Sequence, residues 1–392
     1  MKEIVILGAA RTPIGSFMGA LSSVPAPKLG STAISCALQT AGVSPEQIQQ
    51  VIMGNVLQAA IGQAPARQAG LGAGIPVSAP AVTINKVCGS GLQAVMFAAN
   101  DIRCGDYEIA VAGGMESMSN VPFALPGARS GLRMGNGKVI DLMVHDGLWD
   151  PYDDKHMGSC AEICVDKYEV TREEQDAYTL ESYTRAQDAT RKGKFKSEIA
   201  VVEVSGKKGK TVVADDEEPF AAPLDKMKSL KPAFKKEGGS VTAANSSKIN
   251  DGAAALIVSS AEHASKNGLK PIARIIAQGS VAQEPEWFTT APVRAIDLVL
   301  GKAGMSVEDI DLFEVNEAFA VVAMVAMKES KIPYEKLNVH GGAVALGHPI
   351  GASGARILVT LIHAMRDRNK QRGLAAICIG GGEAAAMIVE LI

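Results

Sequence analysis

The feature of this sequence that most constrains its fold is an internal repeat. Three pairs of segments match each other in the same order along the chain: 41–48 with 303–310, 90–91 with 353–354, and 110–116 with 377–383. The separation between the members of a pair drifts by only a few residues. One such match could arise by chance, whereas three in register indicate two copies of one structural unit.

Each copy has the pattern of an α/β unit. Hydrophobic residues make up 47% of the 392 residues, which is enough for more than one core. The first copy predicts strands at 4–7 and 109–112 and helices at 33–41 and 91–103. The second copy predicts a helix at 354–365 and a strand at 375–379. We therefore expect two doubly wound layers packed face to face.

The region between the copies differs from both. Residues 119–247 are rich in glycine, proline and charge, and their clearest element is a polar helix at 171–192. The apolar segment 250–259 predicts a final strand of the first copy. We therefore divide the chain into a first half (1–118 plus 248–269), an inserted domain (119–247) and a second half (270–392). An insertion of this length is usually functional, so it would cover the active site, bind substrate or form an oligomer contact.

Charge and cysteine content exclude several function classes. The 39 basic and 42 acidic residues give a net charge of −3, which does not favour nucleic acid as a partner. Six cysteines without a CxxC pair suit free thiols in a reducing compartment. No targeting segment and no membrane-length apolar run is visible, so we expect a cytoplasmic protein without a membrane partner. The glycine loops typical of nicotinamide and nucleoside-triphosphate sites are also missing from the sequence.

Cys88 is the first candidate catalytic residue. It lies between an apolar strand at 81–84 and the helix at 91–103, in the segment NKVCGSG. A helix N-terminus is expected to lower the pKa of a thiol there, and the small residues that follow leave room for a substrate carbonyl. This is the arrangement of a nucleophile elbow. A buried, inert cysteine in a glycine-rich turn is the alternative.

Three further residues follow from the repeat. Cys88 aligns with Gly351, which places His348 just before the equivalent turn of the other copy, so His348 is a candidate base. Cys378 ends an apolar strand before three glycines, where α/β folds place their sites. Asn316 lies between a strand and a helix and would either cap the helix or hold an oxyanion through its amide. For His348 and Cys378 the alternative is a purely structural role.

A metal site has weak support. His156, Cys160 and Cys164 would share one helix face, but Gly158 interrupts that helix and no second cluster lies nearby in the sequence. We therefore expect no bound metal.

Together these motifs resemble the thiolase family. The matching segments are NKVCGSG at 85–91, NEAFA at 316–320, GGAVALGHPIGASGAR at 341–356 and CIGGG at 378–382, and the resemblance runs from Lys2 to Ile392. It implies a duplicated five-layer α/β/α/β/α fold with an inserted loop domain, commonly in a homotetramer. The implied activity is acyl transfer: two acetyl-CoA molecules condense to acetoacetyl-CoA and coenzyme A, or the reverse thiolysis occurs, in fatty acid metabolism.

The resemblance also implies residue roles. Cys88 would carry the acyl group and His348 would activate it, while Cys378 would act as acid and base at the substrate α-carbon. Asn316, with a water, and His348 would form one oxyanion hole, and the backbone N–H groups of Cys88 and Gly380 the other. Coenzyme A would be a substrate, with no separate cofactor.

The implied coenzyme A tunnel lies along the inserted domain. Its lining would comprise Leu148, His156, Met157, Leu230, Ala233, Phe234, Ala243, Ser247, Ala318 and Phe319. Met157 would narrow the acyl pocket to short chains, with Phe319 and Met387 adding bulk. Pro219 and Lys226 depart from the family pattern near the nucleotide end. Glu383, the repeat mate of Glu116, is interpreted as structural.

Four alternatives remain open at this point. A degradative 3-ketoacyl-CoA thiolase of broader chain length fits all motifs except Met157. Decarboxylating ketosynthases share the duplicated fold but usually place His where Cys378 stands here. A non-catalytic thiolase-like binding protein would be expected to lack one of the three catalytic residues. A cysteine hydrolase would leave Cys378 and Asn316 without a role.

Overall fold

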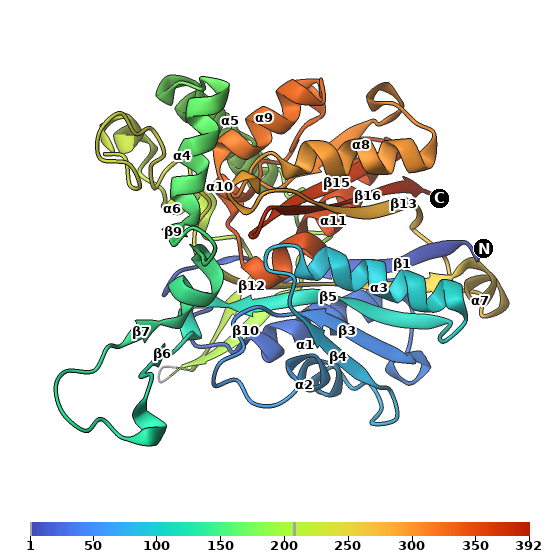
Figure 1. The fold of residues 1–392 in the computed structure, drawn as a ribbon. Helices are drawn as coiled ribbons and strands as arrows, with labels where there is room; N and C mark the ends of the chain where they lie inside the picture. The colour runs from blue at the N-terminus through green and yellow to red at the C-terminus, as the bar shows by residue number, and fades with distance from the viewer. Residues whose placement is uncertain (1, 207–208) are drawn as a thin grey trace.

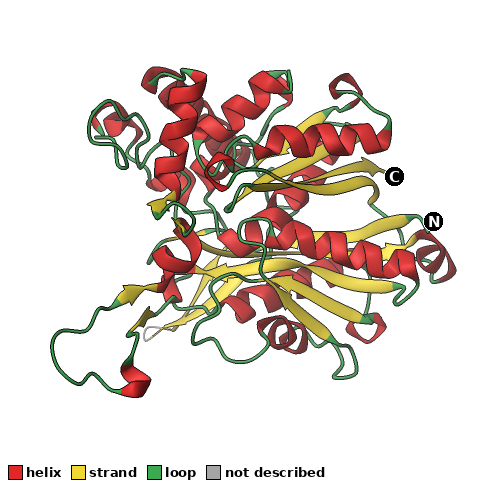
Figure 2. Ribbon diagram, viewed as in Figure 1, coloured by secondary structure: helices red, strands yellow, loops and turns green. Residues whose placement is uncertain are grey.

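The chain folds into five layers, which Figure 1 shows edge-on. The structure, a computed structural model, describes residues 2–206 and 209–392. Helices form the two outer layers and the middle layer, and strands form the two layers between them (Figure 2). This arrangement matches the predicted fold class, because each sheet needs apolar cover on both faces.

The helical layers draw on both halves of the chain. The first outer layer contains α1 (Ala26–Ala41) and α2 (Pro65–Gly72), the middle layer α3 (Ser90–Cys104) and α11 (Ile350–Asp367), and the second outer layer α8 (Ala291–Ala303) and α9 (Ala320–Glu329). Apolar side chains of α3 and α11 pack against strands of both sheets in one continuous core. The middle layer is therefore the place where the two halves meet.

The two halves share one strand topology. The first half has the order β4 (Ala81–Ile84), β3 (Gln50–Gly54), β5 (Ile109–Ser117), β12 (Asn250–Ser260) and β1 (Ile4–Arg11). The second half has the order β14 (Leu312–Val315), β15 (Arg372–Ile379), β16 (Glu383–Leu391) and β13 (Ala273–Ala282). Each begins with parallel pairing and ends with antiparallel pairing, and β1 pairs with β13 at one edge to join them. The sequence repeat is thus a repeat of topology.

Two glycines allow the middle helices to touch at their N-terminal ends. A Cβ atom on Gly91 would lie 2.7 Å from the Ala355 backbone nitrogen, and one on Gly354 would lie 2.5 Å from the Leu92 nitrogen. Both distances are far below van der Waals contact, so larger residues would push α3 and α11 apart. Since Cys88 precedes α3 and His348 precedes α11, this close approach brings the two candidate residues to the same end of the core.

The region 119–247 lies at one end of the layers (Figure 1). It contains α4 (Met157–Tyr168), α5 (Arg172–Arg191) and α6 (Glu218–Ala221), with the short strands β6 (Phe123–Ala124), β7 (Ile140–Asp141), β8 (Trp149–Asp150), β9 (Lys155–His156), β10 (Val202–Gly206) and β11 (Gly209–Val213). Elsewhere, β2 (Gly15–Ser16), α7 (Ala261–Lys266) and α10 (Ala343–Leu346) are the remaining strand and α-helices of the described residues. The boundaries of the three predicted domains stay a prediction.

Most predicted elements form, with shifted ends. The first helix begins at Ala26 rather than at residue 33, because Pro27 in its first turn is compatible with a helix start. β5 extends to Ser117 because its small residues continue to pair with β12. The polar helix forms as α5, and its start is fixed by reciprocal hydrogen bonds between Thr171 and Glu174. Within the described residues, no helix combines the length and apolar character needed to cross a membrane.

Candidate active site

A pocket of about 500 Å³ opens where both halves meet the inserted region. Cys88, His348 and Gly380 lie on its wall. So do nine of the ten residues that the resemblance implies for coenzyme A: Leu148, His156, Met157, Ala233, Phe234, Ala243, Ser247, Ala318 and Phe319. Leu230 lies outside this wall and is 37% exposed. The structure thus gathers residues that are far apart in the sequence into one cavity.

Cys88 sits on a strained turn. The preceding residue, Val87, has a φ of 45°, which is costly for a β-branched side chain. Ser90 holds this turn, since its Oγ accepts from the Lys86 nitrogen (2.9 Å) and donates to the Val87 carbonyl (2.7 Å). Helix α3 begins at Ser90, directly after the cysteine. This local geometry is the strand-to-helix elbow that the sequence pattern predicts.

The prediction that Cys88 has a lowered pKa at this elbow is wrong. Burial raises the pKa of Cys88 to about 11, although hydrogen bonds from the backbone N–H groups of Gly380 and Cys88 itself oppose the rise. The charge of Glu116 adds to the rise. A helix N-terminus does not overcome this desolvation, and His348 does not stabilise a thiolate because it is neutral. Cys88 is therefore a thiol before substrate arrives.

His348 is held as a neutral imidazole. Burial, together with the charge of Arg356, lowers the pKa of His348 to about 3. Its Nδ1 lies 2.6 Å from Ser353 Oγ, and that hydroxyl also lies 2.9 Å from the Pro349 carbonyl. A carbonyl only accepts, so the serine proton points to Pro349 and Nδ1 carries a proton that it donates to Ser353. Nε2 then offers a lone pair to the pocket, and no described residue donates a hydrogen bond to this nitrogen.

Cys378 lies behind the pocket wall at the end of β15. It is fully buried and packs in an apolar cluster with Cys164, Phe288 and Phe319. Burial, and then the charge that Cys88 would carry, raise the pKa of Cys378 well above its ordinary value. The influence of Cys88 on this pKa reflects the proximity of the two sulfur atoms, as a shared site requires.

Asn316 is buried beside β15 with an unused amide. Its backbone nitrogen donates to the Ala376 carbonyl (2.9 Å), yet neither side-chain atom has a partner among the described residues. Helix α9 begins at Ala320, so Asn316 does not cap it. The capping alternative is therefore wrong. A buried amide without protein partners is costly unless water or ligand satisfies it.

Glu116 is a site residue that the sequence does not reveal. Its buried carboxylate accepts from the nitrogens of Val56 (2.9 Å), Leu57 (3.1 Å) and Gly351 (2.9 Å), and from the Asn55 side chain. It thereby ties the start of α11 to the first half. Glu383, its repeat mate, instead pairs with Lys86 in a partly exposed position. In the sequence, Glu116 stands out only as the repeat mate of Glu383, and this match does not indicate that it binds backbone nitrogens of both halves.

Aromatic side chains form the outer wall of the pocket. His156 caps α4 by accepting from the Gly158 nitrogen (3.0 Å), and its ring stacks on Phe234 at a centroid distance of 4.7 Å. Phe319 meets Phe234 edge-on at 6.2 Å. The sulfur of Met157 lies 3.6 Å from where a Cβ on Gly380 would stand, so this side chain narrows the catalytic end. Met387 was expected to add bulk but lies in the central core instead.

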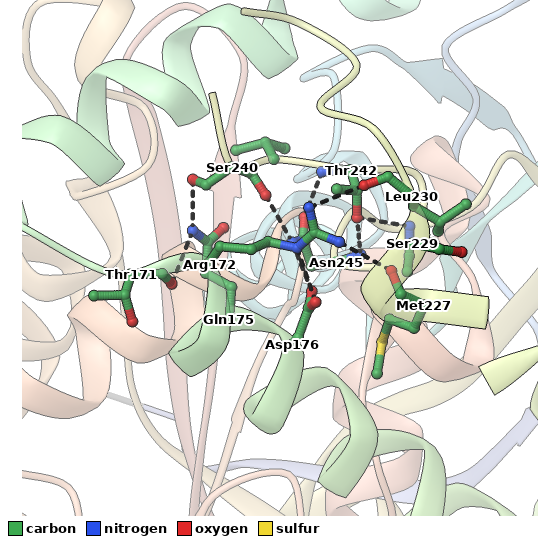
Figure 3. Close-up of polar contacts among 12 residues, drawn as sticks. Thr171, Arg172, Gln175, Asp176, Met227, Ser229, Leu230, Ser240, Thr242 and Asn245 are labelled. Carbon is green, nitrogen blue, oxygen red and sulfur yellow. Dashed lines mark hydrogen bonds and ion pairs between the residues drawn. The ribbon is translucent and has the colours of Figure 1, made fainter. Parts of the chain in front are cut away.

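A polar network holds the segment 227–245 against α5, as Figure 3 shows. Arg172 donates to the carbonyls of Leu230 (3.0 Å) and Met227 (2.9 Å), and it pairs with Asp176 at 2.8 Å. Asp176 in turn accepts from the Asn245 amide at 3.2 Å. The predicted residue Leu230 thus contributes its backbone to a support behind the pocket rather than a side chain to its wall.

The three residues that would share a metal-binding helix face, His156, Cys160 and Cys164, have apolar or aromatic neighbours. Cys160 and Cys164 lie in the apolar cluster of α4, and His156 faces Phe234. The described part of the chain contains no group of three His, Cys, Asp or Glu side chains arranged to hold a metal ion.

The comparisons with known proteins decide the family. Residues 4–262 match the family described as "Thiolase, N-terminal domain", and residues 269–391 match "Thiolase, C-terminal domain". The chain belongs to the thiolase family. The crystal structure of the Bacillus anthracis acetyl-CoA acetyltransferase has the same fold, with a TM-score of 0.97, 41% identity, and coverage of 100% of this thiolase and 99% of that chain.

Two further relatives cover this thiolase over its full length. Acetyl-CoA acetyltransferase 2 of Arabidopsis thaliana is 52% identical, over 100% of this chain and 98% of its own length. The Acat5 thiolase from Ascaris suum, solved in complex with coenzyme A, has a TM-score of 0.95 and 44% identity, with complete coverage of both chains.

Proposed function

We propose that this thiolase is an acetyl-CoA C-acetyltransferase. It joins two acetyl-CoA molecules into acetoacetyl-CoA and coenzyme A, or runs the reverse thiolysis. Relatives with that name support the substrate, at 52% and 50% identity over the whole chain. The observation that carries the chemistry is one pocket whose wall contains Cys88, Gly380 and His348, the last with a free Nε2.

The first half-reaction uses Cys88 and His348. The Cys88 sulfur attacks the carbonyl carbon of acetyl-CoA while its proton passes to Nε2 of His348. The carbonyl oxygen becomes an oxyanion that the backbone N–H groups of Cys88 and Gly380 stabilise. The bond to the coenzyme A sulfur then breaks, and His348 returns the proton to the departing thiolate. The products are acetyl-Cys88 and free coenzyme A.

The second half-reaction adds Cys378 and Asn316. The Cys378 thiolate removes a methyl proton from the second acetyl-CoA, and the resulting enolate carbon attacks the carbonyl of acetyl-Cys88. Acetoacetyl-CoA forms, and the released Cys88 sulfur takes up the proton that Cys378 had accepted. Burial keeps Cys378 a thiol at rest, so its own proton leaves for solvent before it acts as this base.

The enolate oxygen needs donors in this second step. We assign a water held by Asn316, together with Nε2 of His348, to this role. The Ser353 hydroxyl is able to accept from Nδ1 or donate to it, so His348 is able to present Nε2 as an acceptor in the first step and as a donor in the second.

Met157 favours the four-carbon substrate over longer ones. Its side chain stands beside Gly380 on the pocket wall, where a longer acyl chain would need space. The degradative thiolase of broader chain length is the second candidate, since Met157 is the only feature of the pocket that separates the two.

Assembly and location are further parts of the proposal. The segment 122–139 exposes Phe123, Leu132, Met134 and Val139, an apolar set that suits contact with a second copy in a homotetramer. Six free cysteines suit the reducing cytoplasm. Size measurement in solution and cell fractionation test these two points.

A chain-length series tests the function. Purified protein is assayed for thiolysis of 3-ketoacyl-CoA substrates of four to ten carbons, and for condensation of acetyl-CoA. We expect the highest kcat/KM for the four-carbon substrate. Equal or better values for eight- to ten-carbon substrates would establish the degradative alternative, and no thiolysis of any substrate would reject both.

A further inference from the structure

Lys248 makes an unusual set of contacts inside the chain. Its ammonium Nζ donates to three backbone carbonyls, those of Ala243 (2.8 Å), Ala244 (3.1 Å) and Ser246 (2.9 Å). No other described residue donates a hydrogen bond to these carbonyls. The ammonium also lies 5.8 Å from the centre of the Tyr183 ring. Three converging carbonyl oxygens form a cation site, and here a side chain of the same segment supplies the cation.

The segment that Lys248 gathers is a wall of the coenzyme A pocket. Ala243, Ser246 and Ser247 line the cavity together with Lys248 itself. From behind, Asn245 accepts from the Thr242 nitrogen (2.7 Å) and donates to Asp176, which is part of the network in Figure 3. The network around α5 therefore holds the turn 242–246 through Asn245, and Lys248 holds the same turn through three of its carbonyls.

The lysine is also linked to the catalytic histidine. Glu218 has the larger effect of the two carboxylates whose charge acts on Lys248, and it accepts from the Asn250 amide at 3.1 Å. Asn250 in turn accepts from the His348 backbone nitrogen at 2.9 Å. A change at Lys248 thus acts on the substrate wall directly and on the catalytic loop through two intermediate residues.

We propose that Lys248 is a positioning residue for coenzyme A, an internal cation that holds the carbonyls of residues 243–246 and thereby fixes the pocket wall. Without it the three converging carbonyls repel one another and lose the only donor that the described residues give them, so the turn opens. An external monovalent cation is the chemical substitute, because K⁺ binds rings of carbonyl oxygens. This inference rests on the proposed function for the identity of the ligand, but not for the order of the loop.

The test compares two variants of Lys248 with a control. Lys248→Ala removes the charge and leaves space for an ion, whereas Lys248→Met removes the charge and fills the space. Lys266→Met changes an exposed lysine of α7 that pairs only with Glu262. Thiolysis kinetics are measured in KCl, NH₄Cl and N-methylglucamine chloride at equal ionic strength.

We expect both Lys248 variants to raise the KM for coenzyme A about tenfold or more in N-methylglucamine, with a much smaller change in kcat. K⁺ or NH₄⁺ should lower the KM of Lys248→Ala toward the wild-type value and leave Lys248→Met, Lys266→Met and wild type unchanged. A KM of Lys248→Ala within twofold of wild type would overturn the proposal. So would an equal rise in KM in both variants without any response to K⁺, since the side chain would then act by packing alone.

Hydrogen exchange of residues 241–249 separates this inference from the proposed function. The segment should exchange faster in Lys248→Ala than in wild type, and K⁺ should slow it again, whether or not the protein shows thiolase activity. If Lys248→Ala does not fold, faster exchange in the isosteric Lys248→Met still supports the proposal, and unchanged exchange there refutes it.

The pH profile gives a third readout. Burial lowers the pKa of Lys248 to about 8, while Glu218 and Glu317 favour the charged form. Besides these carboxylates, Tyr183 of α5 faces the ammonium. The protonated form makes all three carbonyl bonds and is lost as pH rises, so the wild-type KM for coenzyme A should increase above about pH 8. The same rise in Lys248→Met would assign the titration to another group and count against Lys248.

Discussion

The Ser353 hydroxyl is the sharpest single test of how His348 is activated. It is the acceptor of the buried Nδ1 proton at 2.6 Å, and its own proton is directed to Pro349. Ser353→Ala leaves this Nδ1–H without a partner and removes the preference that keeps Nε2 free. The change deletes only one oxygen atom from a helix that is buried on all sides, so the backbone is expected to stay in place.

The size of the effect follows from how the bond changes during the reaction. A neutral hydrogen bond contributes about 0.5–1.5 kcal/mol, and one to a charged group about 1.5–3 kcal/mol. His348 is neutral at rest and becomes an imidazolium when it takes the Cys88 proton. The bond is therefore worth roughly 1–1.5 kcal/mol more in the transition state than at rest. That difference predicts a fall in rate of about five- to tenfold.

Exchange of labelled coenzyme A into acetyl-CoA measures this step alone, because it requires only Cys88 and His348. Thr360→Val is the matched control, since it removes a buried hydroxyl from the same helix that bonds Glu198 rather than His348. Exchange within twofold of wild type in Ser353→Ala would refute the assigned tautomer. A loss as deep as that of His348→Ala would show that the serine does more than orient the ring.

Three further predictions address the other parts of the site. Cys378→Ala should keep coenzyme A exchange while condensation falls roughly 10²–10⁴-fold, and Cys88→Ala should lose both; near-normal condensation in Cys378→Ala contradicts its role. Met157→Ala should raise kcat/KM for six-carbon relative to four-carbon 3-ketoacyl-CoA by about tenfold or more, and an unchanged ratio would remove Met157 as the chain-length determinant. Alkylation of Cys88 by iodoacetamide should rise about tenfold per pH unit up to its pKa of about 11, and a plateau near pH 8 would show an acidic thiol instead.

The sequence was sufficient for the architecture because the repeat encodes topology. Of the matching segments, 110–116 lies within β5, and 377–383 covers the end of β15 and the turn that follows it. Helix ends were less predictable, since Pro27 starts α1 before the apolar pattern becomes visible. The pairing of β1 with β13 was also hidden, because nothing in either strand alone specifies which edge it joins.

The candidate site was predictable to different degrees. Motifs carried Cys88, His348 and Gly380, because each lies in a glycine-rich turn at an element end. Ser353 and Glu116 could not be recognised from sequence, since a serine in a helix and a glutamate near the end of a strand have many ordinary roles. Their function depends on contacts across the chain, such as the bond from the Gly351 nitrogen to Glu116. The prediction that Met387 adds bulk to the pocket was wrong. Side chains alternate between the two faces of a strand, and this alternation directs Met387 into the core.

The electrostatics of the pair explain why the site can be buried and still react. Both Cys88 and His348 are neutral at rest, because burial raises the pKa of the thiol and lowers that of the imidazole. Proton transfer between them creates two charges in a poorly solvated cavity, which is unfavourable until the new negative charge moves to a substrate oxygen facing the N–H groups of Cys88 and Gly380. Attack on the acyl carbon and proton transfer to His348 are therefore coupled. A substrate carbonyl in position, rather than a preformed thiolate, is what makes Cys88 a nucleophile.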